Sequence, residues 1–207
     1  MLWILGQNGL EFSGDFVDFH DFDAHMKNFC LIALIATCAA FTSDKLIKTK
    51  ISEGITVTLP SELKRMPEED VAQRYPSVRA PLGAFTNQDR VVDFSVNISA
   101  TQWPDENLEM AKEFFKAGIY NLYDRIEMVH EGIYEVHKKK FIYFEFESRL
   151  GASKMKMSSQ EAIVTYTYIQ YLIEPGRAIV FSFNCPKEHR EEWEQKAAAI
   201  MKSIKIK

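Results

Sequence analysis

The feature that most constrains the fold of this chain is the stretch of residues 161–184, EAIVTYTYIQYLIEPGRAIVFSFN. Both of its halves are rich in β-branched and aromatic residues, which favour strands and disfavour a helix of this length. Apolar residues occupy both alternating positions, which indicates strands that are covered on both faces. The stretch therefore predicts a hairpin at the centre of one sheet, sandwiched between other elements.

The two halves meet at Pro175 and Gly176. Proline presets φ for the first central position of a type II turn, and glycine accepts the positive φ of the second. A type II turn splays the strands of a tight hairpin. The sequence therefore predicts a loop of about four residues, or a bulge, in place of a strict two-residue connection.

The charge distribution differs between the two ends of the chain. Residues 1–43 contain five acidic residues and Lys27 as their only basic residue, so residues 44–207 are electrically neutral overall. A neutral domain has no general attraction to nucleic acid or to anionic lipid. We therefore expect no nucleic-acid partner and no membrane contact through bulk charge.

An apolar run near the N-terminus has the pattern of a signal peptide. Lys27 precedes thirteen uncharged residues, 29–41, which are too few to span a bilayer as a helix, where roughly 20 are needed. Two processing routes are open: cleavage near Ala39 and Ala40, or lipoprotein processing with lipidation of Cys38. Thr37 departs from the small residue that usually precedes a lipidated cysteine. The mature protein is expected in the periplasm or cell envelope. Only the lipoprotein route would attach it to a membrane, through a lipid anchor at Cys38.

The domain organisation follows from this leader. Residues 1–25 are interpreted as an over-extended gene start or a disordered extension, residues 26–43 as the signal peptide, and residues 44–207 as one domain. His20 and His25 lie among aspartates, but in this segment we do not interpret them as a metal site. Cys185 is the only cysteine outside the leader, so no intrachain disulfide is available.

The body of the chain predicts an α+β fold in which an antiparallel sheet is sandwiched between helices, in α/β/α layers. After a lead-in at 45–52, an edge or near-edge strand is expected at 55–59, a short helix from Pro67, and strands at 83–86 and 90–98. A long amphipathic helix is expected at 105–123. Strands at 125–130, 133–137 and 141–147 are expected to follow, with turns at Glu131-Gly132 and at the lysines of 138–140. The last helix is expected at 186–202, with Trp193 facing inward.

The chain contains no phosphate-binding glycine loop, no paired metal-binding cysteines and no nucleophile-elbow motif. Cys185 is the one candidate nucleophile, because the start of a helix lowers the pKa of a thiol and His189 follows one turn later as a candidate base. We favour the interpretation that Cys185 is a structural residue and His189 an exposed one.

Two further groups of residues were weighed as sites. His130 and His137 flank a strand that contains Glu131 and Glu135, a set that could bind a metal, although histidines at solvated turns are the commoner outcome. The lysines of 138–140, with Lys154 and Lys156, could form a basic rim. We predict no metal and no cofactor.

A third candidate is a ligand pocket between the long helix and the sheet. Its lining would be Phe114, Phe115 and Tyr120, which lie on or beside the apolar stripe of that helix. Such a pocket would suit a small apolar ligand.

The order of elements resembles the superfamily that joins PsbP of the photosynthetic oxygen-evolving complex, the Ran-binding Mog import factor and the DcrB-like bacterial envelope lipoproteins. The matching segments are residues 54–60 (GITVTLP), 94–96 (FSV), 178–183 (AIVFSF) and 193–206. The resemblance implies an antiparallel sheet between helical layers. It also implies a binding or assembly module, with no shared catalytic residues to place on this sequence.

Two classes of function follow. The favoured class is an exported, non-catalytic binding or assembly module of the cell envelope, with a protein partner. The alternative is a carrier of a small apolar ligand, or a thiol-dependent enzyme that uses Cys185.

Overall fold

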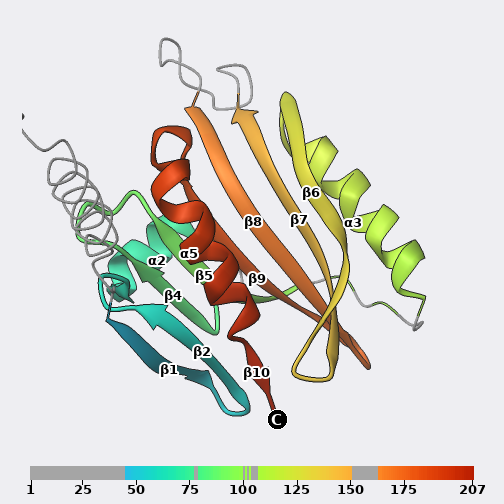
Figure 1. Ribbon diagram of the computed structural model, residues 1–207, viewed down its shortest axis with the longest axis horizontal. Coiled ribbons are helices and arrows are strands. Elements are labelled where there is room, and N and C mark those ends of the chain that lie inside the picture. The colour runs from blue at the N-terminus through green and yellow to red at the C-terminus, as the bar shows by residue number, and fades with distance from the viewer. Residues whose placement is uncertain (1–44, 77–78, 100, 102, 104–106, 151–162) are drawn as a thin grey trace, which may run out of the picture. The chain divides into compact units, whose positions relative to one another are not determined.

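The computed structural model of the protein describes residues 45–76, 79–99, 101, 103, 107–150 and 163–207. These residues belong to one compact unit, Asp44–Lys207 (Figure 1). None of the helices in these ranges is both long and apolar enough to cross a membrane. The elements follow in the order β1 (Leu46–Ser52), β2 (Ile55–Pro60), β3 (Lys64–Arg65), α2 (Glu68–Arg74), β4 (Gly83–Thr86), β5 (Asp93–Ser99), α3 (Leu108–Leu122), β6 (Arg125–Val136), β7 (Lys139–Leu150), β8 (Ile163–Glu174), β9 (Arg177–Pro186), the 3-10 turn η2 (Lys187–His189), α5 (Arg190–Lys202) and β10 (Lys205–Ile206).

The main sheet has seven strands in the order β3-β4-β5-β9-β8-β7-β6, and every neighbouring pair is antiparallel. The hairpin of β8 and β9 lies in its interior, as predicted. Its connection is shorter than predicted, because Glu174 pairs directly with Arg177 across Pro175 and Gly176. Gly176 takes the positive φ of 77°, and an ion pair of 2.6 Å between Arg177 and Glu174 closes the last pair of the hairpin.

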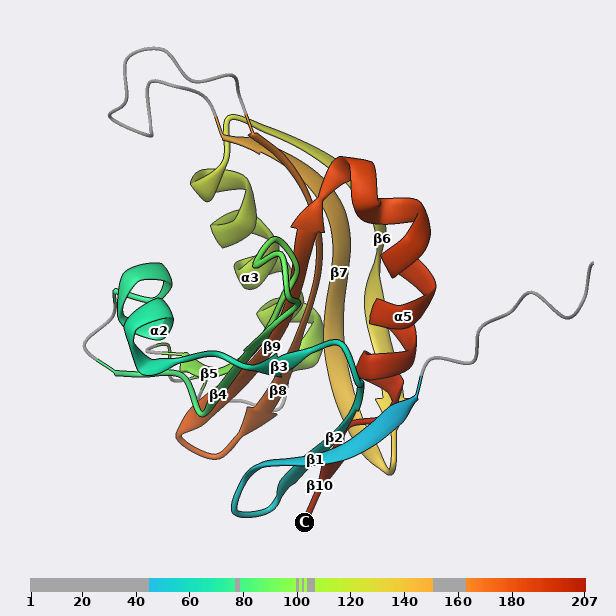
Figure 2. The ribbon, with the colours of Figure 1, turned by 90° about the vertical axis from the view of Figure 1, so that its left-hand side faces the viewer.

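Helices cover the main sheet on both faces, which confirms the predicted α+β sandwich (Figure 2). On one face, Ala111, Phe115 and Ile119 of α3 pack against Phe144 and Tyr171 of the sheet. On the other face α5 contributes to the larger cluster of buried side chains through Trp193, Ala197, Ile200 and Met201. The apolar residues on both parities of β8 and β9 are thus shared between two cores.

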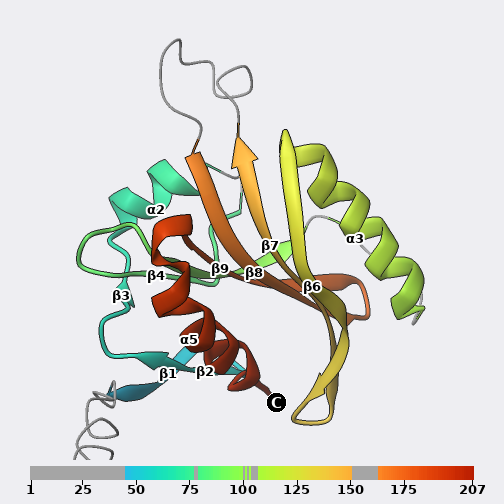
Figure 3. The same cartoon turned by 45° about the horizontal axis from the view of Figure 1, so that its top comes forward.

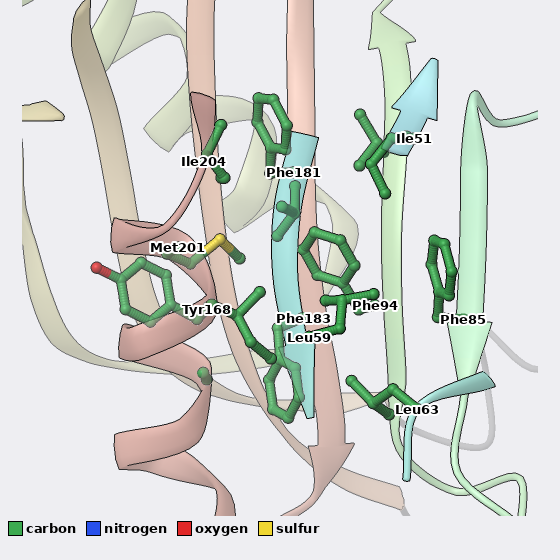
Figure 4. Close-up of a cluster of buried hydrophobic side chains, with 14 of the residues drawn as sticks. Ile51, Leu59, Leu63, Phe85, Phe94, Tyr168, Phe181, Phe183, Met201 and Ile204 are labelled. Carbon is green, nitrogen blue, oxygen red and sulfur yellow. The ribbon is translucent and has the colours of Figure 1, made fainter. Parts of the chain in front are cut away.

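A second sheet of three strands, in the order β1-β2-β10, was not predicted. The lead-in at 45–52 forms β1, and β2 is the middle strand of this sheet. The strand predicted at 55–59 as an edge or near-edge strand therefore belongs to a separate small sheet and not to the single predicted sheet. Ile51, Val57 and Leu59 are buried in the larger core, where Figure 4 shows Leu59 close to Phe183. At the chain terminus, Ile206 pairs with Ile55.

Strand β6 corrects a predicted turn. The sequence predicted two strands separated by Glu131 and Gly132, but β6 is continuous through both residues and has a bulge between Met128 and His130. Gly132 accommodates a ring: a Cβ added there would lie 3.2 Å from Tyr143 Cε1. The chain turns later, at His137 and Lys138, which both have positive φ.

The long helix begins three residues later than predicted. Asn107 caps α3, because its side-chain oxygen accepts a hydrogen bond of 3.1 Å from the backbone N–H of Met110. Asparagine is among the residues that best satisfy the free N–H groups of a first helical turn. The C-terminal end of α3 at Leu122 agrees with the sequence prediction within one residue.

Candidate binding surface

Cys185 lies in β9 and not at the start of a helix. Its side chain is buried in the larger core, and burial, with smaller contributions from Glu188 and Glu192, raises the pKa of the thiol to about 12. The predicted lowering of that pKa by a helix N-terminus is therefore wrong. His189 ends the turn η2, and no hydrogen bond joins it to Cys185 within the described part of the chain.

The candidate metal residues are dispersed. His130 Nδ1 lies 3.1 Å from an oxygen of Glu145, whereas His137 Nδ1 lies 2.9 Å from the backbone oxygen of Ile204. Glu131 pairs with Lys116 at 2.7 Å. Among the described residues, no three metal-ligating side chains form a cluster.

Several other candidates fall outside the described residues. These are the lipidation candidate Cys38, the leader histidines His20 and His25, and the lysines Lys154 and Lys156 of the predicted basic rim. Of the lysines at 138–140, Lys138 is in the turn, and the other two are the first residues of β7.

The three residues of the predicted pocket do not share one environment. Phe115 is buried and stacks on Tyr171 of β8, with 4.1 Å between ring centroids and 14° between the rings. Phe115 thus fills the space between helix and sheet instead of lining it. Phe114 and Tyr120 are exposed on the outer side of α3.

The outer side of α3 carries a second apolar row, which we call the α3 outer stripe: Met110, Phe114, Gly118 and Leu122. Its members recur every four residues and so lie along one ridge of the helix. The side chains of Met110 and Leu122 are 58% and 63% exposed, and Phe114 is 48% exposed. A Cβ added at Gly118 would meet no atom within 4 Å, so the ridge has a gap between Phe114 and Leu122.

Charge is absent from the exposed positions in the second half of this helix. From Phe114 to Leu122 these positions hold Phe114, Ala117, Gly118, Tyr120, Asn121 and Leu122. Lys116 is directed to Glu131 by its ion pair, and the charges of the first half gather around Lys112, which is 3.1 Å from Glu109. Ion pairs therefore border the first half of the stripe, whereas the exposed helix positions beside its second half are uncharged.

Trp103 is a further member of this surface that the sequence reasoning missed. Its ring lies 5.4 Å from that of Phe114, and its Nε1 is buried without a hydrogen-bond partner in the described structure. In the sequence, Trp103 lies two residues before the helix expected at 105–123. One signal in the sequence could have identified Trp103. It is a tryptophan that precedes a capped helix, and the outer face of that helix carries a phenylalanine.

A separate cleft of about 470 Å³ lies between α5 and the small sheet. Leu46 and Pro60 of the sheet and Ala199 and Ile200 of the helix give it an apolar lining. β1 has β2 as its only partner among the described strands, so its outer edge is unpaired. Lys48 and Lys50 lie along β1, and edge lysines of this kind protect against strand-to-strand association.

No protein-family model and no curated protein matches the chain. Among solved structures, cyanobacterial PsbP (CyanoP) from Synechocystis sp. PCC 6803 is similar over 82% of this chain and 97% of its own, with a TM-score of 0.54 and 10% identity. The Ran-binding protein Mog1p of Saccharomyces cerevisiae is similar over 79% of this chain and 96% of its own, with a TM-score of 0.53 and 11% identity.

The chain has the PsbP/Mog1-like fold. At such low identity, the likeness concerns the fold alone. The segments that suggested it from the sequence lie side by side in this PsbP/Mog1-like domain, because residues 54–60 contain β2 and residues 193–206 contain most of α5 and all of β10. Ser203 joins them, since its hydroxyl oxygen accepts a hydrogen bond of 2.9 Å from the backbone N–H of Thr58.

Proposed function

We propose that this PsbP/Mog1-like domain is a non-catalytic protein-binding module of the cell envelope, and that the α3 outer stripe is its binding surface. The observation that carries the proposal is the exposure of large apolar side chains, Met110, Phe114 and Leu122, along one ridge of a helix whose neighbouring ridge is already buried. Contiguous exposed apolar surface is typical of interaction sites.

The shape of the stripe favours a protein over a small molecule. Small ligands bind in concave pockets, whereas the stripe runs along the outside of a helix whose inner side is filled by Phe115. The gap at Gly118 admits one large side chain between Phe114 and Leu122, as in ridge-into-groove packing of helices. We therefore infer a partner that presents an apolar helix or ridge.

The absence of catalysis is part of this proposal. The strongest nucleophile candidate, Cys185, is buried, and its raised pKa keeps it in the thiol form, which is the unreactive one. The histidines that were candidates for a metal site make separate contacts in different parts of the fold.

The binding proposal is tested by site-specific photo-crosslinking in the native host. A photoreactive residue at Ala117, beside the stripe, is expected to give one discrete cross-linked product, which the double variant Phe114→Ser/Leu122→Ser removes. The matched control is the same residue at Gln73, an exposed position of α2. Equal products at both positions, no product at Ala117, or a product of twice the protein's own mass would contradict a heterologous protein partner.

Export is tested separately, by the intact mass and N-terminal sequence of the protein from its native host. Cleavage near Ala39 and Ala40, or a lipid-modified Cys38 as the first residue, is expected. A mature protein that retains residues 26–43 contradicts export. The same measurement decides whether residues 1–25 are translated.

A carrier of a small apolar ligand is the second candidate, and the cleft between α5 and the small sheet is the observation that favours it. Its lining is mostly apolar, and its volume of about 470 Å³ falls within the usual range for small-molecule sites. Ala199→Trp is expected to fill the cleft and to abolish binding of an apolar fluorescent probe. Unchanged probe binding by this variant excludes the cleft as the site.

A further inference from the structure

Two arginines face each other where β6 begins and β7 ends. Arg125 pairs directly with Arg149 in the register of these antiparallel strands, so their side chains project from the same face of the sheet. Like charges in directly opposite positions destabilise a sheet. Neither guanidinium has a hydrogen bond or an ion pair within the described structure, so neither is bound to a carboxylate there.

The neighbouring positions explain why the repulsion persists. On β8, the residue opposite Arg149 is Val164, which has no charge. Along β6 and β7, the next residues on the same face are Glu127 and Glu147, which also pair with each other. Across the two strands, arginine therefore faces arginine and glutamate faces glutamate. An arginine opposite a glutamate at both positions would have given two ion pairs instead.

Glu147 is already committed to other cations. Its two oxygens lie 2.5 Å from Lys187 Nζ and 2.7 Å from Arg190 Nη1. Burial acts to raise the pKa of Glu147, but the hydrogen bonds from Lys187 and Arg190 outweigh it and lower that pKa. The carboxylate stays ionised and is satisfied by these two partners, so it does not neutralise the arginines.

The arginines line a small cleft. Its volume is about 190 Å³, and Ser148, Val164 and Lys187 belong to its lining together with the four residues of the opposed pairs. A water molecule occupies about 30 Å³ of the liquid, so the cleft accommodates a phosphate group with a few waters. Glu127 lies in the same lining and opposes anions, so an anion must contact both guanidiniums directly to gain from this site.

We propose that Arg125 and Arg149 form a binding site for a phosphate dianion, either a free phosphate monoester or the monoester phosphate of a lipid headgroup. The planar guanidinium forms paired, charge-assisted hydrogen bonds with phosphate oxygens. A dianion placed between the two arginines replaces their repulsion with two attractions. The site faces the α5 side of the sheet, opposite α3, so it is independent of the proposed protein-binding stripe.

The test compares thermal unfolding of the full chain in sodium phosphate and in sodium chloride of equal ionic strength. Phosphate is expected to raise the melting temperature of the parent protein more than chloride does. Arg125→Gln and Arg149→Gln are each expected to weaken phosphate binding by about tenfold or more, measured by calorimetry, since a hydrogen bond to a charged group contributes that much. The matched control is Arg177→Gln, which removes an exposed arginine at another turn and is expected to leave phosphate binding unchanged.

Repulsion between the arginines also predicts the stability of the variants without phosphate. Replacing an arginine that stabilises the fold would lower the melting temperature, whereas replacing one of two arginines that repel each other would not. In the absence of phosphate, Arg125→Gln and Arg149→Gln are expected to melt at the same temperature as the parent protein or above it. Lower melting temperatures without phosphate, or an equal phosphate effect in the parent protein and both variants, would overturn the proposal.

Two further probes distinguish a soluble phosphate monoester from a lipid headgroup. Binding of glycerol 3-phosphate identifies a soluble monoester, and arginine-dependent binding to phosphatidic acid vesicles, with phosphatidylcholine vesicles as the reference, identifies a headgroup. Failure with phosphate, glycerol 3-phosphate and phosphatidic acid alike overturns the site. The α3 variant Phe114→Ser/Leu122→Ser is expected to bind phosphate normally, so the two proposals fail independently.

Discussion

Phe114 and Phe115 are adjacent in α3 and have opposite surroundings. Phe115 stacks on Tyr171 in the core between helix and sheet, whereas Phe114 is exposed and touches Trp103. A helix turns by about 100° per residue, so adjacent side chains cannot both face the sheet. Phe115 therefore stabilises the fold, and Phe114 is available for binding.

This difference predicts a large contrast in stability. Phe115→Ala is expected to lower the free energy of unfolding by about 3–5 kcal/mol, the usual effect of removing a buried ring. Phe114→Ala is expected to lower it by less than about 1 kcal/mol, because the ring is half exposed. Urea unfolding of both variants measures the contrast. Equal losses would mean that Phe114 is part of the core, and the α3 outer stripe would then lose its central residue.

Cys185 provides a chemical prediction at the same scale. Because the thiol is buried and its pKa is raised to about 12, a thiol reagent at neutral pH is expected to label the native protein slowly and the unfolded protein fast. His189→Ala is expected to leave the slow rate unchanged. Rapid labelling of the native protein that His189→Ala abolishes would instead identify a nucleophile and its base.

The turn of the β6–β7 hairpin has two residues with positive φ, which affects the stability of the hairpin. Its two turn residues, His137 and Lys138, have φ values of 48° and 66°, a region that few residues other than glycine adopt and in which asparagine, aspartate and histidine are enriched. His137 gains a contact in return, since its Nδ1 lies 2.9 Å from the backbone oxygen of Ile204. Within the part of the chain that the structure describes, Lys138 makes no side-chain hydrogen bond or ion pair that would offset its strain.

Lys138→Gly is therefore expected to raise the free energy of unfolding by about 1 kcal/mol, because glycine adopts positive φ without steric strain. His137→Gly relieves less strain, because histidine tolerates positive φ better than lysine does, and it removes the hydrogen bond to Ile204, so it is expected to give no net gain. Chemical denaturation of the two variants makes the comparison. A loss of stability in Lys138→Gly would show that strain at this turn is not the dominant effect.

Elements with regular periodicity could be predicted from the sequence, and those defined by distant partners could not. The β8–β9 hairpin and the inner stripes of α3 and α5 follow from residues that are close in sequence. The small sheet depends on pairing between Ile55 and Ile206, and no local pattern encodes it. Gly132 was misinterpreted as a turn residue because its role, space for the ring of Tyr143, depends on another strand.

The candidate binding residues also divide into those that a local sequence pattern places and those that depend on a distant strand. The spacing of Phe114 and Gly118 places them beside the buried stripe of α3, and both rows have helical period, so periodicity alone does not show which row faces the sheet. The paired arginines depend on the register between β6 and β7. The bulge before His130 affects that register, and the sequence does not reveal it.

At the scale of the whole domain, α5 connects the two sheets. The helix lies beside β2 of the small sheet and beside β8 and β9 of the main sheet (Figure 3). Near its N-terminus, Lys187 and Arg190 bind Glu147 of the main sheet, and the guanidinium of Arg190 lies 5.3 Å from the centre of the Tyr166 ring. After its C-terminus, Ser203 binds Thr58 of the small sheet. The helix is thus held by polar contacts at both ends and by apolar packing along its length.

The contact at Glu147 makes the stability of the domain depend on pH. The pKa of Glu147 in the folded protein is lower than its ordinary value of 4.5, so the folded state binds the proton less readily than the unfolded state does. Its contribution is therefore fully present above pH 4.5 and is lost as the pH falls through the lowered pKa. Acid is expected to weaken the attachment of α5 to the main sheet.

Glu147→Gln isolates this effect. At neutral pH the variant is expected to be less stable by about 1–3 kcal/mol, since Lys187 and Arg190 lose their charged acceptor. As the pH falls below 4.5, the difference in unfolding free energy between the parent protein and the variant is expected to shrink, because the parent loses the same charge. Glu174→Gln, in the exposed pair with Arg177, is the matched control and is expected to change little at either pH. A difference for Glu147→Gln that stays constant from neutral to acid pH would show that this carboxylate does not stabilise the fold through its charge.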